Sequence, residues 1–131
     1  MTPEEKELFA LCLWREARGE GIEGMRAVAW VIHNRVRAKW GSYKKVILAK
    51  NQFTSMSVST DSQYKLNPKP EDKAYEAACE IAEQFNDPTG GALYYCNPKY
   101  VTSGWFKKNI IDSPKMEKTA AIGRHDFYRE I

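Results

Sequence analysis

The chain has 131 residues, enough for one domain with one sizeable hydrophobic core. Hydrophobic residues make up 43% of it and the net charge is only +3, which excludes a disordered chain and a strongly basic nucleic-acid-binding protein. We therefore expect one domain over residues 1–131, with no nucleic-acid partner. No apolar run is long enough to span a bilayer, so we expect no membrane insertion.

The N-terminal segment lacks the basic region and apolar run of a secretory signal, which predicts synthesis in the cytoplasm without a signal peptide. The three cysteines, Cys12, Cys79 and Cys96, are odd in number and have no metal-ligand spacing. The two histidines, His33 and His125, are too isolated to suggest zinc. We expect no disulfide, no metal and no cofactor.

A first helix should begin at Pro3. Thr2 is a suitable N-cap and Glu5 completes a capping box, while Gly19 and Gly21 end the helix. Glu16 falls on the apolar side of this helix, in line with Phe9, Cys12 and Leu13.

A carboxyl on an apolar face is costly when ionised, so the pKa of Glu16 should rise, as a general acid requires. An ion pair of Glu16 with Arg18 or Arg35 is the structural alternative.

A second helix should run from Glu23 to Lys39. It is apolar on most sides, which is typical of a central helix. Its polar residues are His33, expected to be structural, and Asn34 and Arg35, which are expected to brace the loop that carries Glu16. Ser42 should cap a short helix that ends at Lys50.

The stretch Asn51–Pro70 is polar and irregular, and is either a binding loop or a mobile surface loop. A third helix should open near Pro70, with these core residues: Ala74, Ala78, Ile81, Ala82 and Phe85. The sequence NDPTGG at 86–91 predicts a turn, 92–96 a short strand, and 119–128 an extended segment. The predicted fold class is α+β, mainly helical with a small β element.

Two glutamates, Glu16 and Glu20, form the nearest pair of carboxylates, and glycosidases often use two. Asp61 and Asp126 are other candidates for a second group. Six aromatic residues follow the first two helices, and either line a groove for a polymer such as a glycan or belong to the core and ordinary surface: Phe53, Tyr94, Tyr95, Tyr100, Trp105 and Tyr128.

Four segments occur in an order known from one family: EARGEGIEGMRAVAWVIHNRV, NQF, DPTGGALYYCNP and IGRHDFY. From about Leu8 to Tyr128, the chain resembles the cell wall hydrolase family that includes the spore cortex-lytic enzymes. The resemblance implies a lysozyme-like domain that acts on the glycan strands of peptidoglycan. It implies a lytic transglycosylase that cleaves the MurNAc–GlcNAc bond and leaves 1,6-anhydro-MurNAc.

By the same resemblance Glu16 is the catalytic residue and Glu20 the runner-up. The motif positions Tyr94, Tyr95, His125 and Tyr128 are expected to shape the substrate groove. The stretch 56–70 departs from the family pattern. A compact domain without a signal also resembles a phage endolysin, which reaches the bacterial wall through a membrane hole.

Two alternatives stay open at this stage. A hydrolytic muramidase on the same scaffold would use a second carboxylate, Glu20 or Asp61, to activate water. A non-catalytic wall-binding module would keep its binding after the loss of Glu16.

Overall fold

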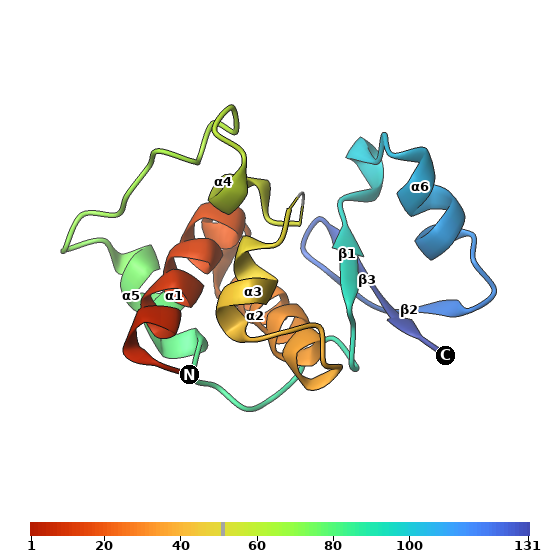
Figure 1. The fold of residues 1–131 in the computed structure, drawn as a ribbon, viewed down its shortest axis with the longest axis horizontal. Helices are drawn as coiled ribbons and strands as arrows, with labels where there is room; N and C mark the ends of the chain where they lie inside the picture. The colour runs from red at the N-terminus through yellow and green to blue at the C-terminus, as the bar shows by residue number, and fades with distance from the viewer. Residues whose placement is uncertain (51) are drawn as a thin grey trace.

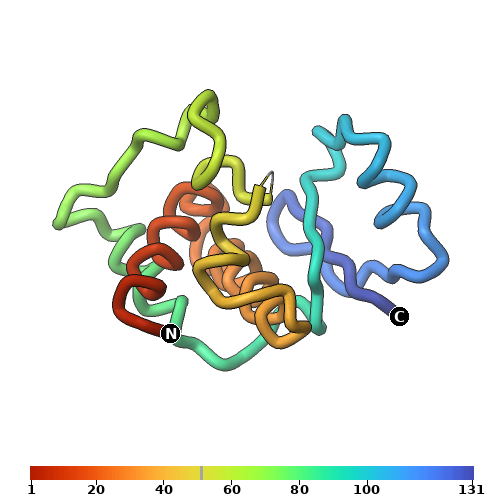
Figure 2. The backbone as a smooth tube through the Cα atoms, in the orientation of Figure 1, coloured from red at the N-terminus to blue at the C-terminus, as the bar shows by residue number. Residues whose placement is uncertain are grey.

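The computed structural model describes residues 1–50 and 52–131, so Asn51 of the predicted loop lies outside the described residues. The helices of residues 3–81 gather on one side of the molecule, and a three-stranded sheet lies on the other side together with the short helix Gly104–Phe106 (Figure 1). The tube in Figure 2 shows the same division along the chain, with the red-to-green first part helical and the teal-to-blue last part forming the sheet and the short helical turns next to it. The predicted α+β class, mainly helical with a small β element, is confirmed.

Helix α1 spans Pro3–Ala17 and begins with the predicted capping box. The Thr2 hydroxyl accepts from the Glu5 amide at 3.1 Å, and the Thr2 amide donates to the Glu5 carboxylate at 3.0 Å. A 3₁₀ turn, η1 (Arg18–Glu20), follows, and Gly21 opens the next helix with a φ of 74°. This left-handed conformation favours glycine, so the break falls where the two glycines predicted it.

Helix α2, Gly21–Arg37, is the central helix, as its apolar sides predicted. One side packs against α1, α3 and α5 through Met25, Val28, Ala29 and Ile32. The other side contributes Ala27 and Val31 to a smaller cluster with Ala92 and Phe127 from the β region. Because α2 belongs to both clusters, it holds the sheet against the helices.

Helix α3, Tyr43–Leu48, is capped by Ser42 as predicted. The next segment, predicted to be irregular, contains one turn of helix, α4 (Thr54–Ser57). Arg15 of α1 fastens this segment, since its Nε donates to the Leu66 carbonyl at 3.0 Å and its Nη1 to the Ser55 carbonyl at 2.9 Å. The segment that follows α3 is therefore anchored to α1 at two points.

Helix α5, Lys73–Ile81, starts at Asp72, whose carboxylate accepts from the Tyr75 amide at 3.0 Å. The expectation that Phe85 packs in the core is wrong, because this side chain is 87% exposed. The helix ends four residues earlier, at Ile81, and Nε of Arg26 donates to Oε1 of Gln84 at 2.8 Å. Phe85 thus lies beyond the helical register that the periodicity assumed.

The predicted turn at 86–91 is organised by Asp87. Its carboxylate accepts from the Thr89 amide and hydroxyl, the Gly91 amide and the Asn34 side chain. Burial alone would raise the pKa of Asp87, but these donors outweigh it and lower the pKa.

The expectation that Asn34 and Arg35 brace the loop carrying Glu16 is wrong. They bind the carbonyls of Ala92 and Leu93, just before the sheet.

The sheet has the order β1-β3-β2 and is antiparallel throughout: β1 is Tyr94–Cys96, β2 Met116–Ile122 and β3 His125–Glu130. A register shift between Lys118 and Ala120 leaves Thr119 as the extra residue, and its hydroxyl donates to the Thr89 carbonyl. Between β1 and β2 lie three short helical turns: η2 (Pro98–Tyr100), α6 (Gly104–Phe106) and the π-helical η3 (Lys107–Ile111). Among the described residues, no helix is both long and apolar enough to cross a membrane.

Candidate active site

Glu16 lies in the last turn of α1 and is half-buried. Its Oε1 accepts a long hydrogen bond, 3.4 Å, from the hydroxyl of Tyr95 on β1. Over the described part of the chain, Glu16 forms no ion pair with Arg18 or Arg35. Arg18 instead binds the Trp14 carbonyl and stacks on the Trp14 ring. The structural alternative for Glu16 is therefore wrong.

Burial raises the pKa of Glu16 above its ordinary value of 4.5, and the negative charge of Asp61 raises it further. Donors from Ser55 and Tyr95 oppose this rise without cancelling it. The Ser55 hydroxyl, which is fully buried, makes no hydrogen bond of good geometry within residues 1–50 and 52–131. A carboxyl with a raised pKa keeps its proton at higher pH, as a general acid requires.

Tyr95 connects Glu16 to the sheet. Burial raises the pKa of Tyr95 well above its ordinary range, and the charge of Glu16 adds to this effect, so the hydroxyl remains a donor. Its ring stacks on Phe127 at 5.7 Å between centroids and meets the edge of His125 at 5.1 Å. The position of the hydroxyl is therefore set by packing within the β region.

Glu20 faces the turn between β2 and β3. Its carboxylate oxygens lie 3.7 Å from His125 Nδ1 and 3.5 Å from Arg124 Nε. Burial lowers the pKa of His125, although the charge of Glu20 opposes this. These contacts connect the start of α2 to the β2–β3 turn, so Glu20 has partners that account for its placement without catalysis.

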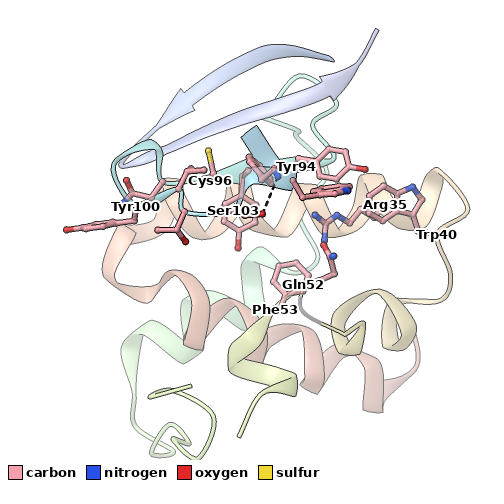
Figure 3. A pocket seen from close by; sticks show the side chains of 14 residues that line it. Arg35, Trp40, Gln52, Phe53, Tyr94, Cys96, Tyr100 and Ser103 are labelled. Carbon is pink, nitrogen blue, oxygen red and sulfur yellow. Dashed lines mark hydrogen bonds between the residues drawn. The ribbon is translucent and has the colours of Figure 1, made fainter. Parts of the chain in front are cut away.

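A pocket of about 750 Å³ opens between the end of α2, the segment after α3, and the β1–α6 region. Figure 3 shows its lining side chains, with Arg35, Trp40 and Phe53 from the helical part facing Tyr94, Cys96 and Tyr100 from the other. Glu16 does not line this pocket, but Tyr95 both lines it and binds Glu16. The carboxyl therefore adjoins the pocket through this tyrosine.

The structure brings together most of the aromatic residues expected at a groove. The following line the pocket: Phe53, Tyr94, Tyr95, Tyr100 and Trp105. Tyr128 and His125 lie outside the lining. Tyr128 is buried and meets the edge of Phe106, whereas His125 supports the Tyr95 ring.

Sequence reasoning missed Arg35, Trp40 and Phe106 as pocket residues. A signal for Arg35 was present, because this charged residue follows Val28 by seven positions and Val31 by four, at core spacing on an apolar helix. Trp40 and Phe106 carry no comparable signal, since the chain segments around them do not repeat at a regular period.

Comparison with known proteins identifies the class. Residues 19–128 match the cell wall hydrolase family, a range that includes Glu20 and begins after Glu16. The chain belongs to the cell wall hydrolase family, which confirms the predicted class of enzyme.

Among curated relatives, the chain is 39% identical over 123 residues to the spore cortex-lytic enzyme of Oceanobacillus iheyensis, covering 92% of this chain and 40% of that protein. The chain spans between a third and about two fifths of the length of the curated relatives it matches.

Two solved structures are similar over 98% of this chain. The catalytic domain of the germination-specific lytic transglycosylase SleB from Bacillus anthracis has a TM-score of 0.74 and 31% identity, and 97% of it is covered. The catalytic domain of the Bacillus cereus SleB protein has a TM-score of 0.72 and 32% identity, with 91% covered. These matches support the predicted lysozyme-like fold.

Proposed function

We propose that residues 1–131 form a catalytic domain that cleaves the MurNAc–GlcNAc bond of peptidoglycan as a lytic transglycosylase. One observation carries this proposal: Glu16 is a half-buried carboxyl with a raised pKa, bound to a tyrosine that lines an aromatic pocket. The similarity to the catalytic domain of a lytic transglycosylase supports it. The substrate is the glycan strand of the bacterial cell wall.

In the proposed first step, protonated Glu16 donates its proton to the glycosidic oxygen. The bond between this oxygen and C1 of the muramyl residue breaks, and the sugar becomes oxocarbenium-like. The GlcNAc residue leaves with its new hydroxyl. The raised pKa of Glu16 keeps this proton on the carboxyl up to a higher pH than in an ordinary glutamate.

In the second step, the Glu16 carboxylate removes the proton from the 6-hydroxyl of the same muramyl residue. The 6-oxygen then bonds to C1 and closes the 1,6-anhydro ring, while Glu16 regains the proton that it gave. One carboxyl serves both steps because the nucleophile is part of the substrate and is already near C1. Tyr95 holds Glu16 through its hydroxyl, and Tyr94 contributes an aromatic wall of the pocket.

A hydrolytic muramidase is the second candidate, and the position of Asp61 favours it. The charge of Asp61 reaches Glu16, so a second carboxylate lies within electrostatic range of the first. The Asp61 oxygens are, however, bound by the Thr54 hydroxyl at 2.6 Å and the Gln63 amide at 2.8 Å. A carboxylate so engaged has fewer free lone pairs for activating a water molecule.

Mass spectrometry of digested peptidoglycan distinguishes the two reactions. The transglycosylase yields muropeptides that end in 1,6-anhydro-MurNAc and resist borohydride reduction. A hydrolase yields reducible ends, and each product gains one water in mass. A digest dominated by reducible ends contradicts the transglycosylase. Absence of any cleavage, with glycan binding retained in Glu16→Gln, points to a wall-binding module.

A further inference from the structure

Arg35 is a buried cation with no anionic partner among the residues that the structure describes. Its side chain is 4% exposed, and its Nε donates to the Leu93 carbonyl at 2.8 Å. Over residues 1–50 and 52–131, no carboxylate lies within 4 Å of its guanidinium, and its two terminal amino groups have no acceptor. Four of its five N–H donors therefore have no acceptor in the described part of the chain.

The guanidinium is held in place by aromatic rings. Its Cζ lies 4.9 Å from the centroid of Trp40, 5.5 Å from that of Phe53 and 5.7 Å from that of Tyr94. All four side chains line the pocket, and Figure 3 shows the Arg35 guanidinium among them, above Gln52. Rings bind a guanidinium through their faces, which leaves its N–H edge free for an acceptor in the pocket.

A buried guanidinium without a counter-ion is energetically unfavourable. Burial lowers the pKa of Arg35, with the hydroxyls of Tyr95 and Tyr94 as opposing influences. A ligand carboxylate in the pocket would supply the missing negative charge and accept two N–H groups at once. A hydroxyl or an amide of the ligand would supply no charge.

We propose that Arg35 binds a carboxylate carried by the muramyl residue of the substrate. The proposal rests on the proposed function and names the chemistry recognised beside Glu16. Arg35 and Tyr95 line the same pocket and the Tyr95 hydroxyl binds Glu16, so an acid bound at Arg35 places the attached sugar beside the tyrosine that holds the catalytic carboxyl. Two sources share this chemistry: the lactyl carboxylate of peptide-free MurNAc and the carboxylates of a stem peptide.

The test measures binding without cleavage, in a Glu16→Gln background. The probes are GlcNAc–MurNAc oligomers with a free lactyl carboxylate, oligomers that carry a stem peptide, and the methylamide of each. We expect at least one acid to bind about tenfold more tightly than its methylamide, in line with a charge-assisted bidentate contact. Whichever acid shows the preference identifies the source. Equal binding of acid and methylamide for both pairs overturns the proposal.

Variants of Arg35 and Arg37 assign the preference to a residue. Arg35→Met should reduce the preference for acid over methylamide to less than about twofold. Arg35→Lys keeps the positive charge but loses the planar guanidinium that can donate two N–H groups to one carboxylate, so it should retain part of the preference. Arg37→Met is the matched control, because Arg37 lies two residues along α2, is exposed and stacks on Trp30 instead. Retention of the preference in a folded Arg35→Met contradicts the proposal.

A second measurement needs no change at Arg35. In NMR titrations, the Nε–Hε resonance of Arg35 should shift with the acid probe and far less with its methylamide. Equal shifts with both probes overturn the proposal even if Arg35→Met does not fold. Because binding is measured apart from cleavage, a digest with reducible ends would refute the transglycosylase and leave the role of Arg35 standing.

Discussion

Glu16 owes its position to helical periodicity, but its chemistry depends on partners that lie far along the chain. Tyr95, which binds its carboxyl, is 79 residues away. Ser55 and Asp61 come from the segment that Arg15 fastens to α1. The proton affinity of this single residue thus depends on three residues from two other parts of the fold, β1 and the segment after α3.

The first prediction concerns catalysis by Glu16. Glu16→Gln keeps the shape of the side chain but removes its titratable proton, so cleavage of purified peptidoglycan should fall roughly a hundredfold to ten-thousandfold. The measurement is loss of turbidity, with circular dichroism to confirm folding. Glu20→Gln is the matched variant and should retain more activity, since Glu20 contacts the β2–β3 turn. An inactive Glu20→Gln beside a nearly wild-type Glu16→Gln would assign catalysis to Glu20.

The raised pKa of Glu16 also predicts a pH-dependent stability. Between the ordinary value of 4.5 and its raised value in the fold, the folded state binds more protons than the unfolded state, so this residue lowers stability as the pH rises through that window. Glu16→Gln should therefore have a higher Tm than the wild type at pH 7. The difference should shrink as the pH falls towards 4.5. A Tm difference that does not change with pH would contradict the raised pKa.

At the scale of elements, the segment after α3 depends on Arg15 more than on its own helical turn. Helix α4 has four residues, too few to be stable alone. Arg15 connects this segment to α1 through two backbone carbonyls that lie eleven residues apart in sequence, those of Ser55 and Leu66. These bonds keep Ser55 and Asp61 near Glu16, which connects the loop to the candidate site.

Removal of Arg15 should loosen this segment. We expect Arg15→Met to lower the free energy of unfolding by about 1–3 kcal/mol, since charge-assisted hydrogen bonds are lost at a partly exposed position. Hydrogen exchange should accelerate across residues 52–70. Arg26→Met is the control, because Arg26 binds Gln84 and Glu23 and should leave exchange in that segment unchanged. Unaltered exchange in Arg15→Met would show that the segment holds its position by other contacts.

At the scale of the molecule, the pocket lies where the helical part and the β region face each other. The helical part contributes one wall and the β region the other. Helix α2 packs against the other helices on one side and against the β region on the other. A ligand bound in the pocket would therefore touch segments that are distant in sequence. Slower hydrogen exchange of the backbone amides in these segments would therefore show where a glycan binds.

We predict that a chitooligosaccharide slows hydrogen exchange on both walls in a Glu16→Gln protein. The affected segments should be residues 52–70, the loop expected to respond to a glycan, and residues 97–106, which line the opposite wall. Helix α5, which contributes no residue to the pocket lining, is the internal control and should show no change in exchange. If the glycan leaves both segments unchanged, the pocket is not its binding site. Protection of only residues 97–106 would exclude a role for the loop.

Local order along the chain was largely predictable. The capping box at Thr2, the cap at Ser42 and the turn at 86–91 depend on neighbours within a few residues, so their sequence signals suffice. The sequence left open whether six aromatic residues line a groove or belong to the core and surface, and five of them line the pocket, whereas Tyr128 is buried outside it. The position of Phe85 was not predictable, because helical periodicity does not show where tertiary contacts end a helix.

The sequence by itself determined the class of fold, the central place of α2 and the presence of Glu16 on the apolar side of α1, because each follows from residue spacing within one element. The sequence also predicted that burial raises the pKa of Glu16. Only the tertiary structure decided that Tyr95 binds Glu16, that the charge of Asp61 raises its pKa further, and that Arg35 faces a pocket instead of pairing with Glu16. Burial and Coulomb interaction sum over every group nearby in space. Those groups come from all along the chain, so no local pattern could specify them.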